Sequence, residues 1–422
     1  MKTKKRLAAI ILLPCLLLAG CASAISVEEL LDAPALTADQ SSVIEALSAV
    51  SEEKVTLKYP SSGGRRAPIQ FVDLDADGSS EAVAFYSLAN EFARLAVLKK
   101  TDGNWRLVST TEGAGTDVES LSVIRLENSE GRYLLVEWSS INSRERQLAA
   151  YHFSEGEISL GFEEACSEIL VYDADSDGYN EFCYITTGSS YEPFKLKYVD
   201  NGSGALMVMS ECELNAEMLS PAYISSGKLA DGRRAVLVDE YISDTEMATE
   251  VFVVSEGRLE AVELADGFDI FELSRRSSEA LACGAYFGGD SVYIPSRTPP
   301  HEQVSAAGEW EYLYAIDGGN ITSEGAALVV QQYGFIVLLP EGWETVSRPL
   351  EYADTPRYFS IYDGNLELEV LEIRVLEIGE LAAPYVSEGY ELLAQSGSYR
   401  YYIKALCSPE DYEFIKQHFA LL

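Results

Sequence analysis

Glycines recur in pairs along most of the chain at an almost constant spacing, and this repeat limits the fold more than any other feature. Four pairs are 24 or 25 residues apart and a fifth is 29 apart: Gly78/Gly103, Gly131/Gly156, Gly178/Gly202, Gly232/Gly257 and Gly289/Gly318. The second glycine of each pair follows Asp, Glu or Asn, which is the chemistry of tight β-turns that need a positive φ. The spacing therefore predicts a series of short antiparallel strands joined by hairpins.

Four strands in about fifty residues make a unit of the size of one β-propeller blade. We therefore expect a mainly β chain with a five-bladed β-propeller of four-stranded blades over residues 55–326. The run VTLKY at residues 55–59 is expected to close the ring against the last blade, because closure removes free sheet edges. Ahead of the propeller, the apolar spacing within residues 37–51 predicts one amphipathic helix.

The pattern changes near residue 327, where the β runs become longer. We expect a separate small α+β domain over residues 327–422, ending in a helix with Ser408 as N-cap and Pro409 in its first turn. The run YGFIVLLPEGW resembles the opening of PsbP-like domains. That resemblance implies an antiparallel sheet backed by helices, with Tyr333, Phe335 and Trp343 in its core.

Two of the repeats carry an acidic loop with the pattern D-x-D-x-D-G-x-x-E. Carboxylates at positions 1, 3 and 5 of a tight loop converge on a hard cation, and the glycine at position 6 permits the sharp turn. Position 7 would add a backbone carbonyl and position 9 a further carboxylate. The candidate metal ligands are Asp73, Asp75, Asp77, Ser79 and Glu81 in the first loop, and Asp173, Asp175, Asp177, Tyr179 and Glu181 in the second.

An EF-hand is excluded, because position 12 is Ala84 or Tyr184 and both flanks of each loop have strand character. The loops instead resemble the FG-GAP or VCBS-type repeats of integrin-like β-propellers. That resemblance implies up to two structural calcium ions, each bound between two strands of a blade. The other three repeats depart from the pattern and are expected to form metal-free turns. The alternative is that both acidic loops are merely exposed Asp-Gly turns.

The N-terminus has the features of a secretory signal. A basic segment, MKTKKR, precedes twelve apolar residues, which are too few to span a bilayer. The following LAGC resembles a bacterial lipobox, which implies cleavage of a signal peptide of residues 1–20 and acylation of Cys21. Residues 21–54 then form a lipidated tether and the first helix. We expect an extracytoplasmic protein held to the bacterial cell membrane by its lipid alone, because two acyl chains suffice for stable anchoring.

The composition is strongly acidic, with 31 Lys and Arg residues against 68 Asp and Glu and a net charge of −37. Such a surface repels nucleic acid and anionic lipid, so neither is an expected partner. The cysteines after Cys21 are widely spaced and form no C-x-x-C motif, which indicates neither a disulfide framework nor a zinc site. They are Cys166, Cys183, Cys212, Cys283 and Cys407, and their redox state is left open, as is the oligomeric state.

No catalytic motif is present, and the three histidines, His152, His301 and His418, lie outside any known arrangement. The chain is therefore expected not to be an enzyme. Aromatic residues near expected strand ends offer a possible platform for a carbohydrate or a peptide. They are Trp138, Tyr191, Trp310 and Tyr312, although each of them could instead pack between blades.

These features predict a surface lipoprotein whose calcium-stabilised propeller acts as a binding or scaffolding module at the cell envelope. The first alternative is a carbohydrate-active enzyme, a glycoside hydrolase or lyase, that uses carboxylates on the propeller axis. The second is an accessory subunit of an envelope or export complex. The sequence names neither a ligand nor a partner.

Overall fold

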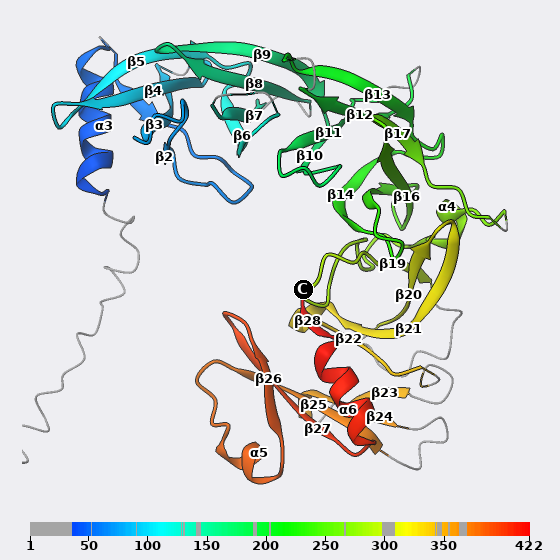
Figure 1. Cartoon of the computed structure of the whole chain (residues 1–422). Helices are drawn as coiled ribbons and strands as arrows, with labels where there is room; N and C mark the ends of the chain where they lie inside the picture. The colour runs from blue at the N-terminus through cyan, green and yellow to red at the C-terminus, as the bar shows by residue number, and fades with distance from the viewer. Residues whose placement is uncertain are drawn as a thin grey trace, which may run out of the picture.

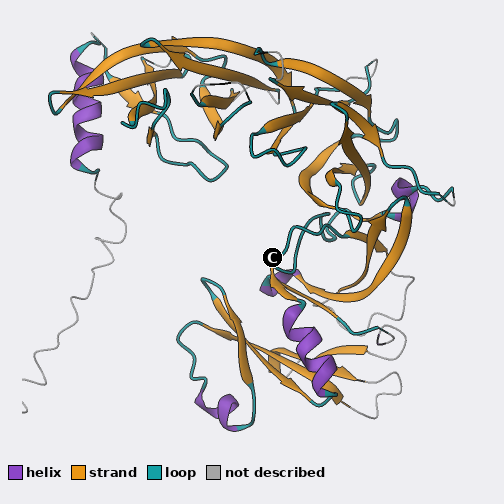
Figure 2. Ribbon diagram, viewed as in Figure 1, coloured by secondary structure: helices purple, strands orange, loops and turns teal. Residues whose placement is uncertain are grey.

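A computed structural model describes residues 36–422 apart from residues 52, 90, 128, 130, 141–144, 189–191, 202–203, 266, 298–308, 342, 344–347, 353–354 and 363–368. The described chain is mainly β, as the sequence predicts, and its strands form six antiparallel sheets. The sheets follow one another along an open arc, with helix α3 at one end and the C-terminal sheet at the other (Figures 1 and 2). Within the described residues, no helix is both long enough and apolar enough to cross a bilayer.

Helix α3 (Ala38–Ala49) confirms the predicted first helix. Thr37 is its N-cap, and the Thr37 hydroxyl and the Gln40 side chain form a reciprocal capping box. Val43 and Leu47 are buried against the first sheet. The helix therefore covers the outer end of that sheet (Figure 1).

The first four sheets are each built around a meander of four antiparallel strands. The first comprises β1 (Val55–Leu57), β2 (Ile69–Val72), β3 (Glu81–Leu88), β4 (Arg94–Thr101) and β5 (Asn104–Glu112). The second comprises β6 (Asp117–Ile124), β7 (Tyr133–Ser139), β8 (Arg146–Ser154) and β9 (Glu157–Cys166). The third comprises β10 (Glu168–Tyr172), β11 (Glu181–Ile185), β12 (Lys195–Asp200) and β13 (Met207–Glu213). The fourth comprises β14 (Ser220–Lys228), β15 (Arg234–Tyr241), β16 (Glu246–Ser255), β17 (Arg258–Ala261) and the short β18 (Arg276–Ser277), with α4 (Ile270–Leu273) beside β16. Strand β1 is added to the first sheet beside β3, and β18 to the fourth beside β16.

The hairpin glycines have the backbone that the repeat predicts. Gly103, Gly156 and Gly257 have φ values of 82°, 83° and 73°, and the residue before each also has a positive φ. Two consecutive positive φ angles belong to the type I′ turn, whose twist matches that of the flanking strands. These glycines therefore lie in the β4–β5, β8–β9 and β16–β17 hairpins of the first, second and fourth sheets.

The expected ring closure is wrong. Residues 55–57 form β1, which pairs with β3 of its own sheet and continues the line of β2 along the same edge. Figure 1 shows the arc open between α3 and the last sheet. Val55 and Leu57 are half-buried and pack on the core of their own sheet, which includes Ile69 and Tyr86; this packing favours pairing of β1 within that sheet.

The fifth and sixth sheets share one core. The fifth comprises β19 (Ile294–Arg297), β20 (Glu309–Asp317), β21 (Asn320–Val330), β22 (Phe335–Leu338) and β28 (Phe419–Leu421). The sixth comprises β23 (Arg348–Tyr352), β24 (Thr355–Tyr362), β25 (Glu369–Glu377), β26 (Glu391–Gln395) and β27 (Tyr399–Ala405), with the short helix α5 (Ala383–Ser387) before β26. Phe335 and Val337 of the fifth sheet pack with Phe359, Ile373 and other residues of the sixth in a single cluster.

The expected boundary between residues 326 and 327 therefore falls inside strand β21, and the chain has no break in its core there. The final helix is α6 (Pro409–Gln417), with Ser408 as N-cap, as predicted. It ends earlier than the sequence pattern indicates, because residues 419–421 pair with β22 as strand β28. Tyr333, Phe335 and Trp343 lie in or against the shared core, as expected.

Backbone hydrogen bonds from the β6–β7 and β10–β11 loops link the first three sheets. The Arg132 amide donates to the Leu74 carbonyl, at 2.8 Å, and so links the second sheet to the first. The Asn180 amide donates to the Arg125 carbonyl, also at 2.8 Å, between the third sheet and the second. The two acidic loops thus lie at junctions between sheets.

Candidate metal site in the acidic loops

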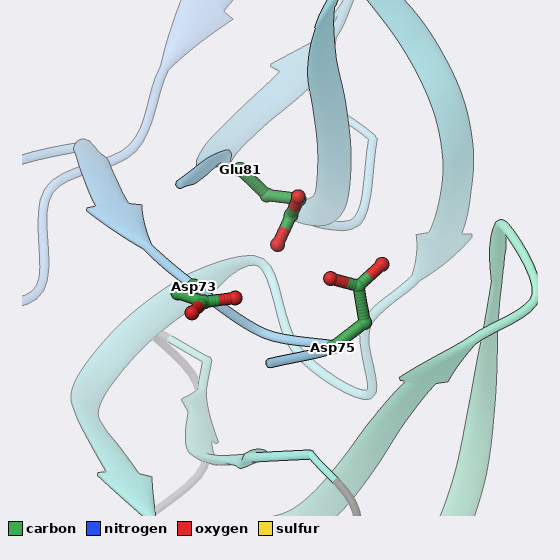
Figure 3. A group of neighbouring side chains, drawn as sticks. All are labelled: Asp73, Asp75 and Glu81. Atoms are coloured by element: carbon green, nitrogen blue, oxygen red, sulfur yellow. The ribbon is translucent and has the colours of Figure 1, made fainter. Parts of the chain in front are cut away.

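The first acidic loop connects β2 to β3 and is folded by its own carboxylates. Asp73 Oδ2 accepts from the Gly78 amide at 3.2 Å, and Asp77 Oδ1 accepts from the Ser79 amide at 2.8 Å. Glu81, at the start of β3, is 1 % exposed and accepts from the Leu74 amide at 2.8 Å. These bonds hold the loop in a tight curl, with the carboxylates of Asp73, Asp75 and Glu81 turned toward a common space (Figure 3).

The second acidic loop, between β10 and β11, has the same bonds at the same offsets. The Gly178 amide donates to Asp173 Oδ2 at 3.2 Å, and the Tyr179 amide donates to Asp177 Oδ1 at 2.8 Å. Glu181 is 3 % exposed and accepts from the Ala174 amide at 2.6 Å. Gly78 and Gly178 have φ values of 86° and 89°, a left-handed conformation that glycine adopts without steric cost.

In each loop the structure brings together three of the five predicted ligands. One carboxylate oxygen each from Asp73, Asp75 and Glu81 lie within 4.8 Å of one another, and the same holds for Asp173, Asp175 and Glu181. Position 5 is Asp77 in the first loop and Asp177 in the second. It is outside both groups, because its carboxylate accepts a hydrogen bond from the backbone amide two residues later. The Tyr179 ring lies against the Arg125 guanidinium, 4.7 Å from the ring centroid.

The two loops differ in the residue that faces them from the next strand. Lys99 on β4 directs its ammonium group into the first loop, 2.6 Å from Asp75 Oδ2, 3.0 Å from Asp77 Oδ2 and 3.4 Å from Glu81 Oε1. The hydrogen bond to Asp75 is the main cause of a raised pKa of Lys99, which keeps the ammonium charged. The first loop therefore already contains a cation supplied by the protein.

The corresponding position in the second loop is acidic. Ala82 pairs with Leu98 in the first sheet and Phe182 pairs with Val199 in the third, so Lys99 and Asp200 occupy equivalent places. Among the described residues, no ion pair involves the carboxylates of the second loop. Burial, with the nearby charges of Asp175, Asp200 and Asp177, raises the pKa of Glu181 to about 7.

This donor set fits a divalent cation. All the converging atoms are carboxylate oxygens, which are the ligands that hard cations such as Ca²⁺ prefer. In the first loop, Asp73 Oδ1 is buried and has no hydrogen-bond partner among the described residues. In the second loop, a bound cation would offset the burial and the nearby negative charges that raise the pKa of Glu181.

Of the four residues of the expected aromatic platform, the structure describes the side chains of two, Trp138 and Tyr312. Trp138 is 1 % exposed, donates from Nε1 to Tyr151 Oη at 3.1 Å and meets the Phe85 ring edge-on. It therefore packs between the first and second sheets. Tyr312 is half-buried on β20. Tyr191, the side chain of Trp310, and Cys21 lie outside the described residues.

Two residues that distinguish the loops, Lys99 and Asp200, were missed by the sequence analysis. Each lies about twenty residues beyond its loop, at the strand position opposite the ninth residue of the acidic pattern. A comparison of the two repeats in register would have exposed the exchange of lysine for aspartate. The pattern within the loop gives no sign of it.

No known family's sequence profile matches the chain, and no curated protein matches it. Among solved structures, it is similar to a rhamnogalacturonan lyase from Bacillus licheniformis, with 11% identity, a TM-score of 0.34, and coverage of 75% of this chain and 70% of that one. It is also similar to an exotype rhamnogalacturonan lyase, with 13% identity, a TM-score of 0.29, and coverage of 72% and 80%. The periplasmic gluconolactonase of Pseudomonas aeruginosa gives 14% identity, a TM-score of 0.24, and coverage of 65% and 95%.

These comparisons correct one expectation. The absence of a catalytic motif led us to expect that the chain is not an enzyme, whereas all three of these solved structures are named as enzymes. The non-enzymatic assignment is therefore withdrawn. With TM-scores below 0.5, the likeness assigns neither lyase nor lactonase activity to this chain.

Proposed function

We propose that this chain is an extracytoplasmic lipoprotein whose blade-like sheets form a calcium-dependent binding scaffold, and that the second acidic loop binds the ion. The observation that carries this proposal is the convergence of Asp173, Asp175 and Glu181, which have no basic partner among the residues that the structure describes. Asp200, at the end of β12, adds a further negative charge near Glu181. The first loop, in contrast, already holds the Lys99 ammonium among its carboxylates and is proposed to remain metal-free.

The location of the second loop gives the ion a structural role. Asn180 donates from its amide to the second sheet, and the Ser176 hydroxyl accepts from Arg234 Nε of the fourth sheet at 3.1 Å. Three sheets therefore meet at this loop. An ion that fixes the loop would fix the relative position of the sheets, which is the requirement for any binding surface that spans them.

We expect isothermal titration of the purified protein to give one calcium ion per chain. For a dissociation constant of about 0.1–1 mM, typical of extracellular modules, 1 mM calcium would stabilise the fold by roughly 0.4–1.4 kcal/mol. Asp175→Asn should abolish both the binding and the stabilisation, because it removes a converging carboxylate from the loop that has no cation. The measurements are the titration and thermal unfolding with EDTA or calcium.

Asp75→Asn is the matched control, since it makes the same change at the same position of the first loop. It should leave the stoichiometry at one. Lys99→Asp should raise the stoichiometry toward two, because it gives the first loop the charge pattern of the second. Calcium binding that is lost in Asp75→Asn and retained in Asp175→Asn would refute the assignment.

A carbohydrate-active enzyme is the second candidate, and one carboxyl group favours it. A general acid needs a raised pKa and access to substrate. Among the described carboxyl groups, Glu168 combines these properties: its side chain is 32% exposed and burial raises its pKa, although Arg146 opposes the shift. Arg146 bridges it to Glu137, with contacts of 3.1 Å and 3.2 Å respectively.

If this candidate is right, the protein should release products from at least one polysaccharide. Glu168→Gln should then lower the rate by about 100-fold or more, the usual contribution of a general acid. Reducing-end and unsaturated-product assays on a panel of plant and microbial polysaccharides provide the measurement. A Glu168→Gln variant that folds and retains the full rate would exclude Glu168 as the acid.

A further inference from the structure

Three segments that are distant in the sequence enclose a shallow groove on the first sheet. They are the N-terminal turn of α3, the end of β2 with the acidic loop after it, and the β4–β5 hairpin. The groove has a volume of about 540 Å³, which is within the range of small-molecule sites. Its lining residues are Asp39, Phe71, Ser79, Ser80, Lys100, Gly103 and Trp105.

The floor of this groove, the Phe71 groove, is aromatic. Phe71 is 39 % exposed, although it lies in the middle of strand β2. Its ring centroid is 5.4 Å from that of Trp105, and the two planes are inclined by 39°. An exposed ring beside a buried, fixed ring presents an apolar face of defined orientation, and the weakly positive C–H groups of a ligand are attracted to such a face.

The wall of the groove is a fixed pair of charges. Asp39 Oδ1 accepts from Lys100 Nζ at 2.6 Å and from Trp105 Nε1 at 3.0 Å. These two bonds, chiefly the one from Lys100, lower the pKa of Asp39, so that it is a carboxylate at neutral pH. Both bonds use the same oxygen, and Oδ2 has no partner in the described part of the chain. The wall therefore offers one free acceptor and the remaining protons of one ammonium group.

The charges around the groove select against an anionic ligand. Lys100 is balanced by Asp39, and Lys99, its neighbour on β4, points to the other face and pairs with the acidic loop. The Asp77 carboxylate, on the same loop as Ser79, is 47% exposed. A ligand in this groove thus meets an apolar floor, hydroxyl and carboxylate acceptors, and no uncompensated positive charge.

We propose that the Phe71 groove binds a neutral pyranose unit of an oligosaccharide. The C–H face of the sugar would lie on the exposed ring of Phe71, which the buried Trp105 supports, and adjacent hydroxyl groups would bond to Asp39 Oδ2 and Lys100 Nζ. A sugar has both an apolar C–H face for the aromatic floor and hydroxyl groups for the charged wall. A purely apolar ligand would leave the polar groups of the wall without hydrogen bonds. The site is independent of calcium in the second acidic loop and goes beyond the scaffold role.

The test is titration calorimetry of the full-length protein in detergent solution with cellohexaose, xylohexaose and mannohexaose at millimolar concentrations, and with hexagalacturonate as the anionic comparison. We expect at least one neutral hexasaccharide to bind, hexagalacturonate not to bind, and Phe71→Ala to weaken binding by about tenfold, the effect of losing one stacked ring. The matched control is Phe92→Ala, because Phe92 is 47 % exposed, belongs to the same sheet region and does not line the groove.

Asp39→Asn provides a second variant, which keeps the shape of the wall and removes its negative charge. It should also weaken binding, with a melting temperature within a few degrees of the unaltered protein. The proposal is overturned if none of the three neutral sugars binds, if only hexagalacturonate binds, or if Phe71→Ala binds as tightly as Phe92→Ala.

Discussion

Replacing Arg276 with methionine should lower the free energy of unfolding by about 3–5 kcal/mol, because it leaves the Asp239 carboxylate buried without a counter-charge. Both side chains of this ion pair are 1% exposed, and Arg276 Nη2 lies 2.8 Å from Asp239 Oδ1. The Thr249 hydroxyl also donates to Asp239 Oδ1, and the Cys283 amide donates to Oδ2. Urea unfolding of the purified protein measures the change.

The same arginine holds an irregular segment onto the fourth sheet. Its Nε donates to the Leu281 carbonyl at 2.8 Å, and Nη1 donates to the Ser274 carbonyl at 2.9 Å. Arg275→Met is the matched control, since Arg275 forms exposed ion pairs with Glu217 and Glu272 whose loss should cost no more than about 1 kcal/mol. Equal costs for Arg275→Met and Arg276→Met would contradict the prediction.

The second large effect is expected at Glu240, which follows Asp239 on strand β15 and points to the opposite face of the fourth sheet. Its side chain is 0 % exposed and lies beside Glu250 of β16, which accepts from the Asn215 amide at 2.8 Å. Neither carboxylate can donate to the other, so the pair is relieved only when a proton is shared between them. Burial, followed by the contact with Glu250, raises the pKa of Glu240 to about 11.

The sign of the pH dependence follows from this shift. The folded state holds a proton on Glu240 that the unfolded chain releases near its ordinary pKa of about 4.5. Stability from this group is therefore fully present below that value and declines as pH rises toward the folded pKa, by at most about 1.4 kcal/mol per pH unit. Glu240→Gln keeps a neutral side chain at every pH and should remove this decline.

We therefore expect Glu240→Gln to stabilise the protein increasingly between pH 5 and pH 9, with a gain of at most about 1.4 kcal/mol per pH unit. Near pH 4 it should have little effect, because the unaltered group is then protonated in both states. Glu260→Gln, an exposed carboxyl on the adjacent strand β17, is the control and should show no such trend. A constant difference between Glu240→Gln and the unaltered protein across this range would rule out the shared proton.

Asp239 and Glu240 illustrate how far the sequence can be interpreted. They are consecutive, so the pleat directs them to opposite faces of β15. In an isolated antiparallel sheet one of them would meet water. Both are buried because the fourth sheet is covered on both faces, by the core that it shares with the third sheet and by the core that includes residues of the fifth. Their partners, Glu250 and Arg276, come from other segments, and no local pattern indicates them.

The sequence by itself determined the local structure of this protein. Turn glycines after Asp or Glu set the hairpins, Thr37 and Ser408 began their helices, and alternating aspartates with Gly78 and Gly178 folded two matching acidic loops. These are interactions between residues close in the chain, where residue type nearly fixes the backbone. The same logic could not separate the two loops, because Lys99 and Asp200 reach them from another strand.

Only the tertiary structure decided how the sheets assemble. The arc is open because β1 pairs within its own sheet. Residues 327–330 and 335–338 belong to the fifth sheet, and alternate apolar side chains among them face a core shared with the sixth. Trp138 is buried between sheets, whereas Phe71, which has no distinguishing pattern, is exposed in a groove. The physical reason is the same in each case. Burial and pairing across sheets depend on which surfaces meet, and apolar side chains alone do not specify their partners.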